Sequence, residues 1–548
     1  MDVLLIAVNA KYIHPNHAVR LLKVNSLLDV DYLEYTLKDS MTAMLHDITA
    51  KKPKLVGLSV YIWNASFMID LAHAIKKQLG LPVLLGGPEV SYDAAYYLKV
   101  TQADAILCGE GEADFDAVSS ALLNGTTDIA LASVAWRHHP VDISTMPQAQ
   151  ANLATLKSPY PHGSDLEDLS HKIAYVEASR GCPYACSFCL SSLEKGVRFF
   201  PLEQVLNTLD AMQAAQAKTF KFLDRTFNAS RLTKAIIDHI VTTHEKGAVY
   251  QFEITGDILD PSLIEHIHRV APKGLFRFEV GIQSIHDSVN KRVFRHQNTT
   301  RLFKTLKTLI EQDIVTLHLD LIAGLPGETL AMFKETFDKT YRLGAQELQL
   351  GVLKLLRGTL LREQADMYGM VFDSEPPYTI GQTKWLSAAD LETILHVEAM
   401  LNLFHNRGLL GTFVYTVLNA MPSPFAAFLS LQNHAVKHGL DPHRYQLEAV
   451  YTVFDAFLKS HHLEEESATL RRIYLLRAKV KPPCYFPLVT DRTCMRHVYE
   501  YLAKTHQLPV QLFYKHARLI EEKAGYVAVL YQNQTATLYT CPHGAWET

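Results

Sequence analysis

The sequence predicts an α/β protein of several domains, and three observations support this. The chain has 548 residues, too many for one hydrophobic core, which favours two to four domains. Two separate stretches alternate short aliphatic or β-branched runs with amphipathic ones, the pattern of parallel strands joined by helices. After about residue 372 long helical runs dominate. We therefore expect two α/β domains followed by a mainly helical domain.

The first domain is expected at residues 1–125. Its strand candidates are VLLIAV (3–8), VDYLEY (30–35), KLVGLSV (54–60), PVLLGG (82–87) and ADAILCG (103–109). Amphipathic segments between them, such as residues 67–80, indicate a doubly wound parallel sheet. Ligands of such sheets bind beyond the carboxyl ends of the strands, so a ligand is expected at the loops that follow them.

A linker is expected at residues 126–170, where periodicity weakens and prolines accumulate, and we expect a short hairpin within it. A second α/β domain is expected at residues 171–371. Its strand candidates are residues 174–179, 219–224, 250–255, 275–281, 316–323 and 346–353. Six strand–helix units are too few for a closed eight-fold barrel, so the pattern favours a partial, six-fold barrel.

The third domain is expected at residues 372–548 and to be mainly α-helical. Residues 387–408 and 446–461 are its clearest helix candidates. The tail is expected to add a few strands, with candidates at residues 471–481, 526–532 and 535–540.

Composition limits the function classes. The formal net charge is −4 and 48% of the residues are hydrophobic, so the whole chain has neither the basic excess of a nucleic-acid-binding protein nor the composition of a disordered one. Seven cysteines, three of them close together, and the lack of a recognisable signal peptide favour a reducing, cytoplasmic location. No apolar run approaches the roughly 18 residues that span a bilayer, so no membrane contact is expected.

Three cysteines stand in SRGCPYACSFC (179–189), directly after a predicted strand. Cys182, Cys186 and Cys189 have the spacing C-x-x-x-C-x-x-C. Structural zinc closes its shell with four ligands, usually on paired C-x-x-C arms, and remains the main alternative. Three thiolates on a [4Fe–4S] cluster would leave one iron open to a substrate or cofactor.

This motif resembles that of the radical S-adenosylmethionine (SAM) superfamily, in its cysteine spacing, its aromatic Phe188 and its place after the first barrel strand. FEVGIQS (278–284) and DLIAGLPGET (320–329) fall where that superfamily contacts SAM. The resemblance implies that the open iron binds SAM and that cleavage yields a 5′-deoxyadenosyl radical. It also implies an external low-potential reductant of the flavodoxin or ferredoxin type.

Several polar residues and one glycine are expected around SAM. Asp224 is expected to accept from the methionyl ammonium group, and Arg295 to pair with the methionyl carboxylate. Gly324 is expected to let the backbone approach the adenine. The full set is Phe188, Asp224, Glu279, Gln283, Ser284, Arg295 and Gly324. Taken singly, each polar residue has an ordinary strand-end or helix-cap contact as its alternative.

The domain order resembles the class of radical SAM enzymes that carry an N-terminal Rossmann-like cobalamin-binding domain. The D-x-H-x-x-G motif of many cobalamin domains is absent from residues 1–125, as it commonly is in this class. The cobalamin-binding residues that we expect are Tyr12, His14, Ser59, Gly86, Gly87, Glu110 and Gly111.

Of the two histidines in the first loop, His14 is preferred over His17 for an approach to cobalt. The alternatives are that His14 caps a helix or binds a propionamide. For the domain as a whole, the alternative is a Rossmann-like domain for another nucleotide or for none, although G-x-G-x-x-G is absent after the first strand.

The resemblance is strongest at residues 158–192, to a subgroup with a C-terminal extension of unassigned function. One departure is Arg357, where the superfamily often has proline. Cys108 is expected in the core. Cys484, Cys494 and Cys541 are expected to be separate thiols, with an auxiliary cluster as the alternative.

The expected function is methyl transfer from methylcobalamin to an unactivated carbon of a small molecule, with the C-terminal domain closing the barrel mouth. Cobalamin-dependent radical cyclisation or oxidative rearrangement stays open. So does radical modification of tRNA, which would require a basic surface on the C-terminal domain. A non-catalytic cobalamin or redox sensor is the remaining alternative.

Overall fold

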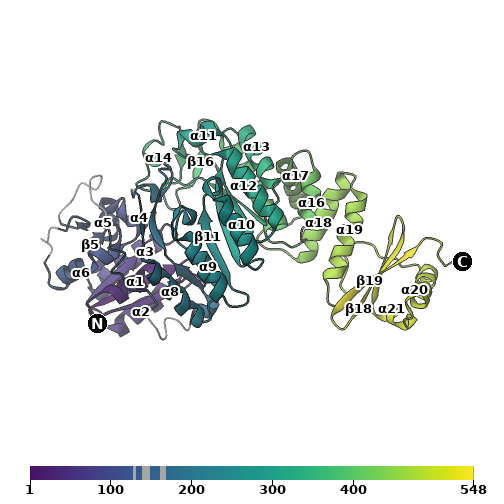
Figure 1. Ribbon diagram of the computed structural model, residues 1–548, viewed down its shortest axis with the longest axis horizontal. Helices are drawn as coiled ribbons and strands as arrows, with labels where there is room; N and C mark the ends of the chain where they lie inside the picture. The colour runs from purple at the N-terminus through teal and green to yellow at the C-terminus, as the bar shows by residue number, and fades with distance from the viewer. Residues whose placement is uncertain (127–130, 139–148, 161–167, 195, 547–548) are drawn as a thin grey trace. The chain divides into compact units, whose positions relative to one another are not determined.

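The computed structural model describes residues 1–126, 131–138, 149–160, 168–194 and 196–546 (Figure 1). The chain divides into two compact units. The first comprises Met1–Thr336 and Leu350–Leu391, and the second comprises Phe337–Gln349 and Glu392–Thr548. Both α/β sheets belong mainly to the first unit, and most of the helical C-terminal region forms the second.

The first sheet has six strands in the order β2-β1-β3-β4-β5-β6. Their bounds are β1 Val3–Asn9, β2 Val30–Thr36, β3 Leu55–Ser59, β4 Val83–Gly86, β5 Ala105–Leu107 and β6 Val134–Trp136. Strands β1 to β5 pair in parallel, and β6 is antiparallel to β5. The five strand candidates of the first domain are therefore confirmed.

The linker contributes to this sheet. Its residues 134–136 form β6, which pairs with β5 rather than with another part of the linker. Residues 127–130, 139–148 and 161–167 of the expected linker lie outside the described residues, so the expected hairpin stays a prediction for them. The domain boundaries likewise stay predictions.

Helices pack on both faces of the first sheet. They are α1 His17–Asn25, α2 Met41–Lys51, α3 Ala65–Ala74, α5 Ala94–Thr101 and α6 Phe115–Leu123. Every residue of β1 is buried, as expected for a parallel strand covered on both faces. The cap of α1 is Asn16, whose side chain accepts a hydrogen bond from the Val19 amide at 3.1 Å. His14 is therefore not the helix cap, which removes one of its alternatives.

The second sheet also has six strands, in the order β14-β13-β12-β11-β10-β7. Their bounds are β7 Ile173–Val176, β10 Thr219–Phe222, β11 Val249–Ile254, β12 Phe276–Gln283, β13 Thr316–Ala323 and β14 Glu347–Val352. The order follows the chain and the pairs from β7 to β13 are parallel, which is the expected partial six-fold barrel.

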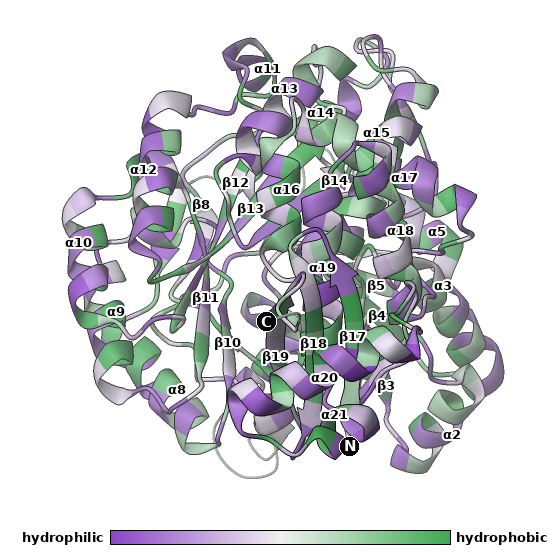
Figure 2. Cartoon of the chain, turned by 90° about the vertical axis from the view of Figure 1, so that its right-hand side faces the viewer, coloured by the Kyte–Doolittle hydropathy of each residue, from purple (hydrophilic) through white to green (hydrophobic). Residues whose placement is uncertain are grey.

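Burial alternates along β10, β11 and β12, so each of these strands has a buried face with aromatic residues and a half-buried, mostly polar face. Phe222 and Phe252 lie on the aromatic face, with ring centroids 4.6 Å apart. The helices that follow the strands are α8 Leu202–Ala214, α9 Thr233–Thr243, α10 Pro261–Val270, α12 Thr299–Gln312 and α13 Leu330–Tyr341. Figure 2 shows both purple and green residues on α10 and α12, as expected for amphipathic helices that cover a sheet.

The cysteine motif starts on a strand of its own. The candidate at residues 174–179 divides into β7 and β8 Ser179–Cys182, and β8 pairs with β9 Gly196–Phe199 in an antiparallel two-stranded sheet. The motif therefore begins on a fixed strand rather than in a free loop.

The second unit is mainly helical, as expected. Its principal helices are α16 Phe413–Ala420, α17 Pro424–Lys437, α18 Leu447–Ser460, α19 Glu464–Arg477, α20 Arg492–His506 and α21 Val510–His516. It also receives most of α15 Ala388–Met400. The tail adds an antiparallel sheet of β17 Ala517–Glu522, β18 Gly525–Gln532 and β19 Thr535–Pro542.

One strand candidate of the tail is wrong. Residues 471–477 belong to α19, in which Leu470, Tyr474 and Leu475 are buried at helical spacing. Because arginines lie between these apolar positions, the hydrophobic pattern fits a strand as well as a helix.

Among the described residues, we find no single helix with the length and apolar composition needed to cross a membrane. By length and composition alone, α16 and α17 would satisfy that test as a pair, although they meet at a bend of 115°.

Candidate functional site

A cavity of about 870 Å³ lies between the strand-end loops of the first sheet and the barrel strands, within the first unit. This volume is near the upper end of the roughly 300–1,000 Å³ usual for small-molecule sites. Six of the seven residues expected to bind cobalamin line it, namely His14, Ser59, Gly86, Gly87, Glu110 and Gly111. The barrel domain contributes Tyr175, Glu177, Arg180, Gly181, Lys221, Arg225 and Glu253, among others.

Tyr12 is not among the residues that line the cavity. Its side chain is 61% exposed, and the Lys172 ammonium lies over its ring, 4.8 Å from the centroid. The structure therefore places Tyr12 at the surface of the first loop rather than in the cavity where the sequence suggested it.

Two adjacent glycines keep the wall beside β4 free of side chains. A Cβ at Gly87, whose φ is +114°, would lie 2.4 Å from the Val60 carbonyl oxygen, so only glycine fits there. A Cβ at Gly86 would have nothing closer than the Leu107 carbonyl oxygen at 3.9 Å. The bare backbone at Gly86 thus leaves space that a side chain would fill, as a large, flat ligand requires.

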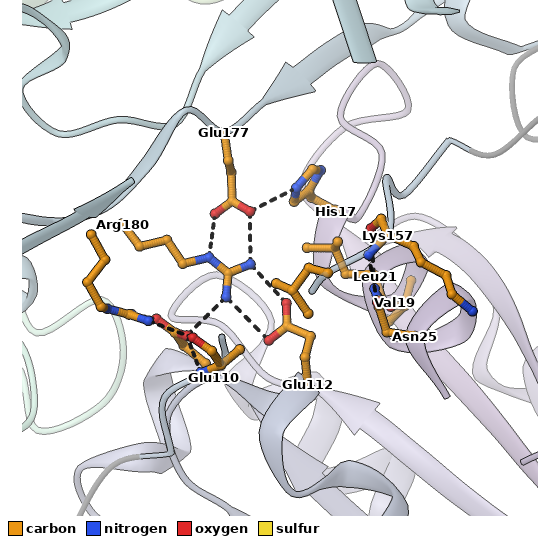
Figure 3. Close-up of polar contacts among 12 residues, drawn as sticks. His17, Val19, Leu21, Asn25, Glu110, Glu112, Lys157, Glu177 and Arg180 are labelled. Atoms are coloured by element: carbon orange, nitrogen blue, oxygen red, sulfur yellow. Dashed lines mark hydrogen bonds and ion pairs between the residues drawn. The ribbon is translucent and has the colours of Figure 1, made fainter. Parts of the chain in front are cut away.

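An ion-pair network joins the first domain to the cysteine-bearing strand (Figure 3). The Arg180 guanidinium, on β8, contacts Glu177 at 2.9 Å, Glu112 at 2.9 Å and Glu110 at 3.2 Å. His17 Nε2 lies 3.3 Å from Glu177 Oε2, the same oxygen that Arg180 contacts at 2.9 Å. The side chains of Arg180 and of the three glutamates are each at most 15% exposed. Arg180 therefore links the loop after β5 to a point two residues before Cys182.

The network keeps Glu177 ionised. Burial alone would raise the pKa of Glu177, but Arg180 and His17 outweigh it and lower this pKa to about 2. Glu110 is also engaged by Arg198 and accepts a hydrogen bond from the Ala151 amide at 2.7 Å. Glu110 therefore lines the cavity, but its carboxylate is already paired with groups of the protein.

A second polar cluster joins the same two domains. The Tyr378 hydroxyl donates to Glu89, which also accepts from Tyr97 at 2.7 Å. Arg357 donates to the Tyr378 hydroxyl at 2.7 Å and pairs with Asp93. Burial raises the pKa of Glu89, which lines the cavity. This contact gives Arg357, noted above as a departure from proline, a structural role.

The three motif cysteines lie near one another but have different environments. Cys182 ends β8, Cys186 is buried, and the Cys189 amide donates to the Cys186 carbonyl at 3.0 Å. Burial raises the pKa of Cys186, and the charges of Cys189 and Cys182 raise it further while Arg295 opposes them. The three thiols are thus within electrostatic reach of one another.

In the part of the chain that the structure describes, no three or more His, Cys, Asp or Glu side chains converge on a point that could hold one metal ion. A [4Fe–4S] cluster differs because each thiolate binds a different iron, so the sulfur atoms need not converge on one point. The spacing and mutual proximity of the motif cysteines fit that donor set.

The residues expected around SAM lie outside the lining of the cavity and fall into two groups. The first group is Gln283 and Glu279, which can accept a hydrogen bond from a ligand or exchange their present partner for one. Among the described residues, the buried side-chain oxygen of Gln283, at φ +63°, has no hydrogen-bond partner, and Glu279 pairs with Lys221 at 3.2 Å. A buried acceptor without a donor is costly in a folded protein, so Gln283 fits a position that a ligand completes.

The other residues already have protein partners. Asp224 accepts from the Ala178 amide at 3.0 Å and from the Ser179 hydroxyl, and it is 1% exposed. It therefore anchors β8, and its expected contact with the methionyl ammonium group stays a prediction. Ser284 is fully buried and donates to Glu328 at 2.6 Å.

Gly324, Arg295 and Phe188 complete the set. A Cβ at Gly324 would lie 2.0 Å from the Ile380 side chain, so packing within the protein already requires glycine there. Arg295 donates to the Gly281 carbonyl and, at 3.1 Å, to Gln297. Phe188 is half-buried beside Cys189.

The sequence analysis missed Arg180, Glu177 and Glu112. The one local signal was the pair of charged residues in EASRGC just before the first cysteine. The other cysteines are all free: Cys108 is buried in the core of the first domain, as expected, and Cys541 is buried in that of the tail.

Three segments of the chain match known domain families. Residues 4–119 match the B12 binding domain, residues 176–340 the radical SAM superfamily, and residues 366–534 a protein of unknown function, DUF4080.

The curated relatives match only in part. A ribosomal protein uS12 methylthiotransferase RimO of Nitratiruptor sp. is 27% identical over 173 residues, which is 30% of this chain and 39% of the relative. A tRNA-2-methylthio-N(6)-dimethylallyladenosine synthase of Hydrogenovibrio crunogenus is 26% identical over 185 residues, 30% of this chain and 36% of the relative. The chain thus spans about two fifths of the length of these relatives.

Two solved structures share the fold over most of the chain. The cobalamin-dependent SAM radical enzyme OxsB with aqua-cobalamin has a TM-score of 0.61 at 15% identity, covering 86% of this chain and 78% of its own. The radical SAM methyltransferase TsrM from Kitasatospora setae, with cobalamin and a [4Fe–4S] cluster, has a TM-score of 0.58 at 15% identity, covering 80% and 99%.

The cofactors of these two domain types are cobalamin for the first, and SAM with a [4Fe–4S] cluster for the second. The chain therefore contains a B12-binding domain and a radical SAM domain, in the order and fold of cobalamin-dependent radical SAM enzymes, followed by a domain of unknown function.

Proposed function

We propose that this protein transfers a methyl group from methylcobalamin to an unactivated carbon of a small molecule. The observation that carries this proposal is the cavity shared by the two domains, whose lining runs from Gly86 to Gly181, next to Cys182. A substrate held there would lie between the two cofactor-binding domains.

When bound, a [4Fe–4S] cluster with SAM supplies a 5′-deoxyadenosyl radical after an external reductant delivers one electron, and methylcobalamin supplies the methyl group. The chain's own part is to hold and orient. Cys182, Cys186 and Cys189 would bind the cluster, and Asp224 fixes the start of their segment. The unpaired side-chain oxygen of Gln283 would accept a hydrogen bond from SAM.

His14 is the cavity-lining side chain that would approach cobalt when cobalamin is bound. It lines the cavity, and its Nδ1 is 2.7 Å from the Tyr175 hydroxyl, which fixes the ring and leaves Nε2 as the other ring nitrogen. Burial lowers the pKa of His14, which favours the neutral imidazole that binds metals. His17 already uses Nε2 for Glu177.

An electron paramagnetic resonance spectrum of the protein loaded with cob(II)alamin tests this role. Coordination by His14 predicts nitrogen hyperfine splitting that His14→Phe abolishes and the matched variant His17→Gln retains. If the splitting is absent, or survives His14→Phe, His14 does not bind cobalt, and the propionamide contact remains.

Product analysis tests the reaction. The protein is reconstituted anaerobically with iron, sulfide and cobalamin and supplied with SAM and flavodoxin. A methyl transferase that recharges cobalamin from SAM yields both 5′-deoxyadenosine and S-adenosylhomocysteine. Radical cyclisation or rearrangement yields 5′-deoxyadenosine without S-adenosylhomocysteine.

Two variants separate these outcomes from inactive protein. Cys186→Ala is expected to lose the iron–sulfur absorbance and all 5′-deoxyadenosine, whereas Cys484→Ala, at a thiol outside the motif, is expected to retain both. If the wild-type protein forms no 5′-deoxyadenosine with cluster and cobalamin bound, it is a sensor and the proposal is wrong.

A further inference from the structure

Positive charge is concentrated in one segment of the second unit. Residues 471–518 contain ten Lys or Arg and only two Asp or Glu, whereas the whole chain has 53 and 57. Because acidic residues elsewhere in the chain balance these cations, the whole-chain net charge of −4 does not reveal the basic character of this segment. It runs from the end of α19 through α20 and α21 to the start of β17 (Figure 1).

Lys481 and Arg518 lie close to each other although they are distant in sequence, and the backbone of Lys515 contacts Lys481. Lys481 Nζ lies 3.4 Å from the Lys515 carbonyl oxygen, and the Arg518 guanidinium donates twice to the Pro482 carbonyl, at 2.9 and 2.6 Å. Partial burial, and then the nearby charge of Arg518, lower the pKa of Lys481.

In the described part of the chain, these cations lack acidic partners. Over the described residues, no carboxylate lies within ion-pair distance of Lys481, Lys515 or Arg518, whereas Arg472 of the same segment pairs with Glu522. Like charges held together without a carboxylate are unfavourable in the free protein, and an anionic ligand would relieve the repulsion.

The helix that carries Lys515, α21, also carries an exposed aromatic ring. Tyr514 precedes Lys515 and is 47% exposed. Its ring meets that of Tyr499 edge to face, with centroids 5.1 Å apart, and Tyr499 is buried at 1% exposure. Tyr514 is therefore held in a fixed orientation with part of its surface open to solvent.

We propose that this terminal basic surface, defined as Lys481, Tyr514, Lys515 and Arg518, binds single-stranded nucleic acid. Uncompensated cations match the phosphate backbone, and an exposed, oriented ring offers a platform on which a base stacks. A duplex would leave the ring without a base to stack on, since its bases are already stacked. The inference concerns binding and does not depend on the reaction proposed above.

Fluorescence anisotropy with the full chain tests the charges. Labelled oligouridylate and oligothymidylate of about 20 nucleotides serve as the RNA and DNA probes. The double variant Lys481→Glu/Lys515→Glu is expected to lower affinity for at least one probe about tenfold and to reduce the salt slope by about 1.4, or about 0.7 for each phosphate contact. Lys38→Glu/Lys52→Glu, with the same change of charge on exposed residues of the first domain, is expected to bind like the wild type.

A second pair of variants tests stacking. Tyr514→Ala is expected to lower affinity about tenfold, and Tyr514→Phe, which keeps the ring, is expected to retain it. Circular dichroism melts verify that each variant is folded. Different losses for the two probes would distinguish RNA from DNA as the preferred strand.

The proposal is wrong if neither probe binds, or if the control pair loses as much affinity as the Lys481/Lys515 pair. It is also wrong if polyglutamate competes as well per charge as oligonucleotide while Tyr514→Ala changes nothing, because the surface would then recognise an acidic protein. Equal binding of a duplex and the single strands would exclude the role of Tyr514.

Discussion

The Arg180 network and the terminal basic surface show two opposite uses of charge. Arg180 is 11% exposed and surrounded by Glu177, Glu112 and Glu110. Lys481, Lys515 and Arg518 have no carboxylate within ion-pair distance in the described part of the chain. Buried charges with complete partners fix the position of the segments that carry them, whereas charges without partners are available to a ligand.

Removing the central cation should have the largest effect. Arg180→Met leaves three acidic side chains largely buried without their common partner, and we expect the free energy of unfolding to fall by about 3–5 kcal/mol. Urea denaturation of the full chain measures this change in the transition that involves the first unit.

Lys234→Met is the matched control, because Lys234 pairs with Asp238 on an exposed helix surface. That pair contributes about 0.5 kcal/mol or less. If Arg180→Met costs no more than this control, the network does not hold the two domains together.

Glu328 provides an intermediate case, a buried acid without a cation. Burial raises its pKa from 4.5 to about 8, against a lowering by its hydrogen bond with Ser284. The folded protein thus keeps a proton that the unfolded chain releases above about pH 4.5, and the free energy of unfolding should decrease as pH rises from about 4.5 to about 8, then level off.

Denaturation at pH 6 and pH 9 measures this slope. Glu328→Gln mimics the protonated form and should remove part of the slope, with a difference on the order of 2–4 kcal/mol. A slope unchanged by the substitution would show that Glu328 is ionised in the folded protein.

Adding a carboxylate to the terminal basic surface should have the smallest effect on stability. Val480 is 70% exposed and precedes Lys481. Val480→Glu supplies the missing counter-charge, so we expect weaker oligonucleotide binding with a change in unfolding free energy within about 0.5 kcal/mol. Val480→Gln, of similar size but neutral, is the control, and equal binding by both variants would contradict the electrostatic account.

The strands of both sheets could be predicted because periodicity and β-branched runs are local signals. The position of the cavity followed as well, since strand ends of a parallel sheet meet at one edge. Six expected cobalamin residues line that cavity for this reason.

Contacts between distant segments could not be predicted. Glu112 and Arg180 are 68 residues apart, and no local pattern connects them. Asp224 and Gly324 were expected to contact SAM, but the sequence did not indicate their partners within the protein, Ser179 and Ile380. The strand predicted at residues 471–481 was wrong because interleaved arginines gave no clear period.

Arg357 also has a consequence for how this sequence can change over time. It shares one hydrogen-bonded cluster with Glu89, Asp93 and Tyr378, which lie up to 289 residues apart. A proline at position 357 would leave the carboxylates of Glu89 and Asp93 without their cation. We therefore expect these four positions to be inherited together, so that homologues with proline at 357 also lack the acid at 89.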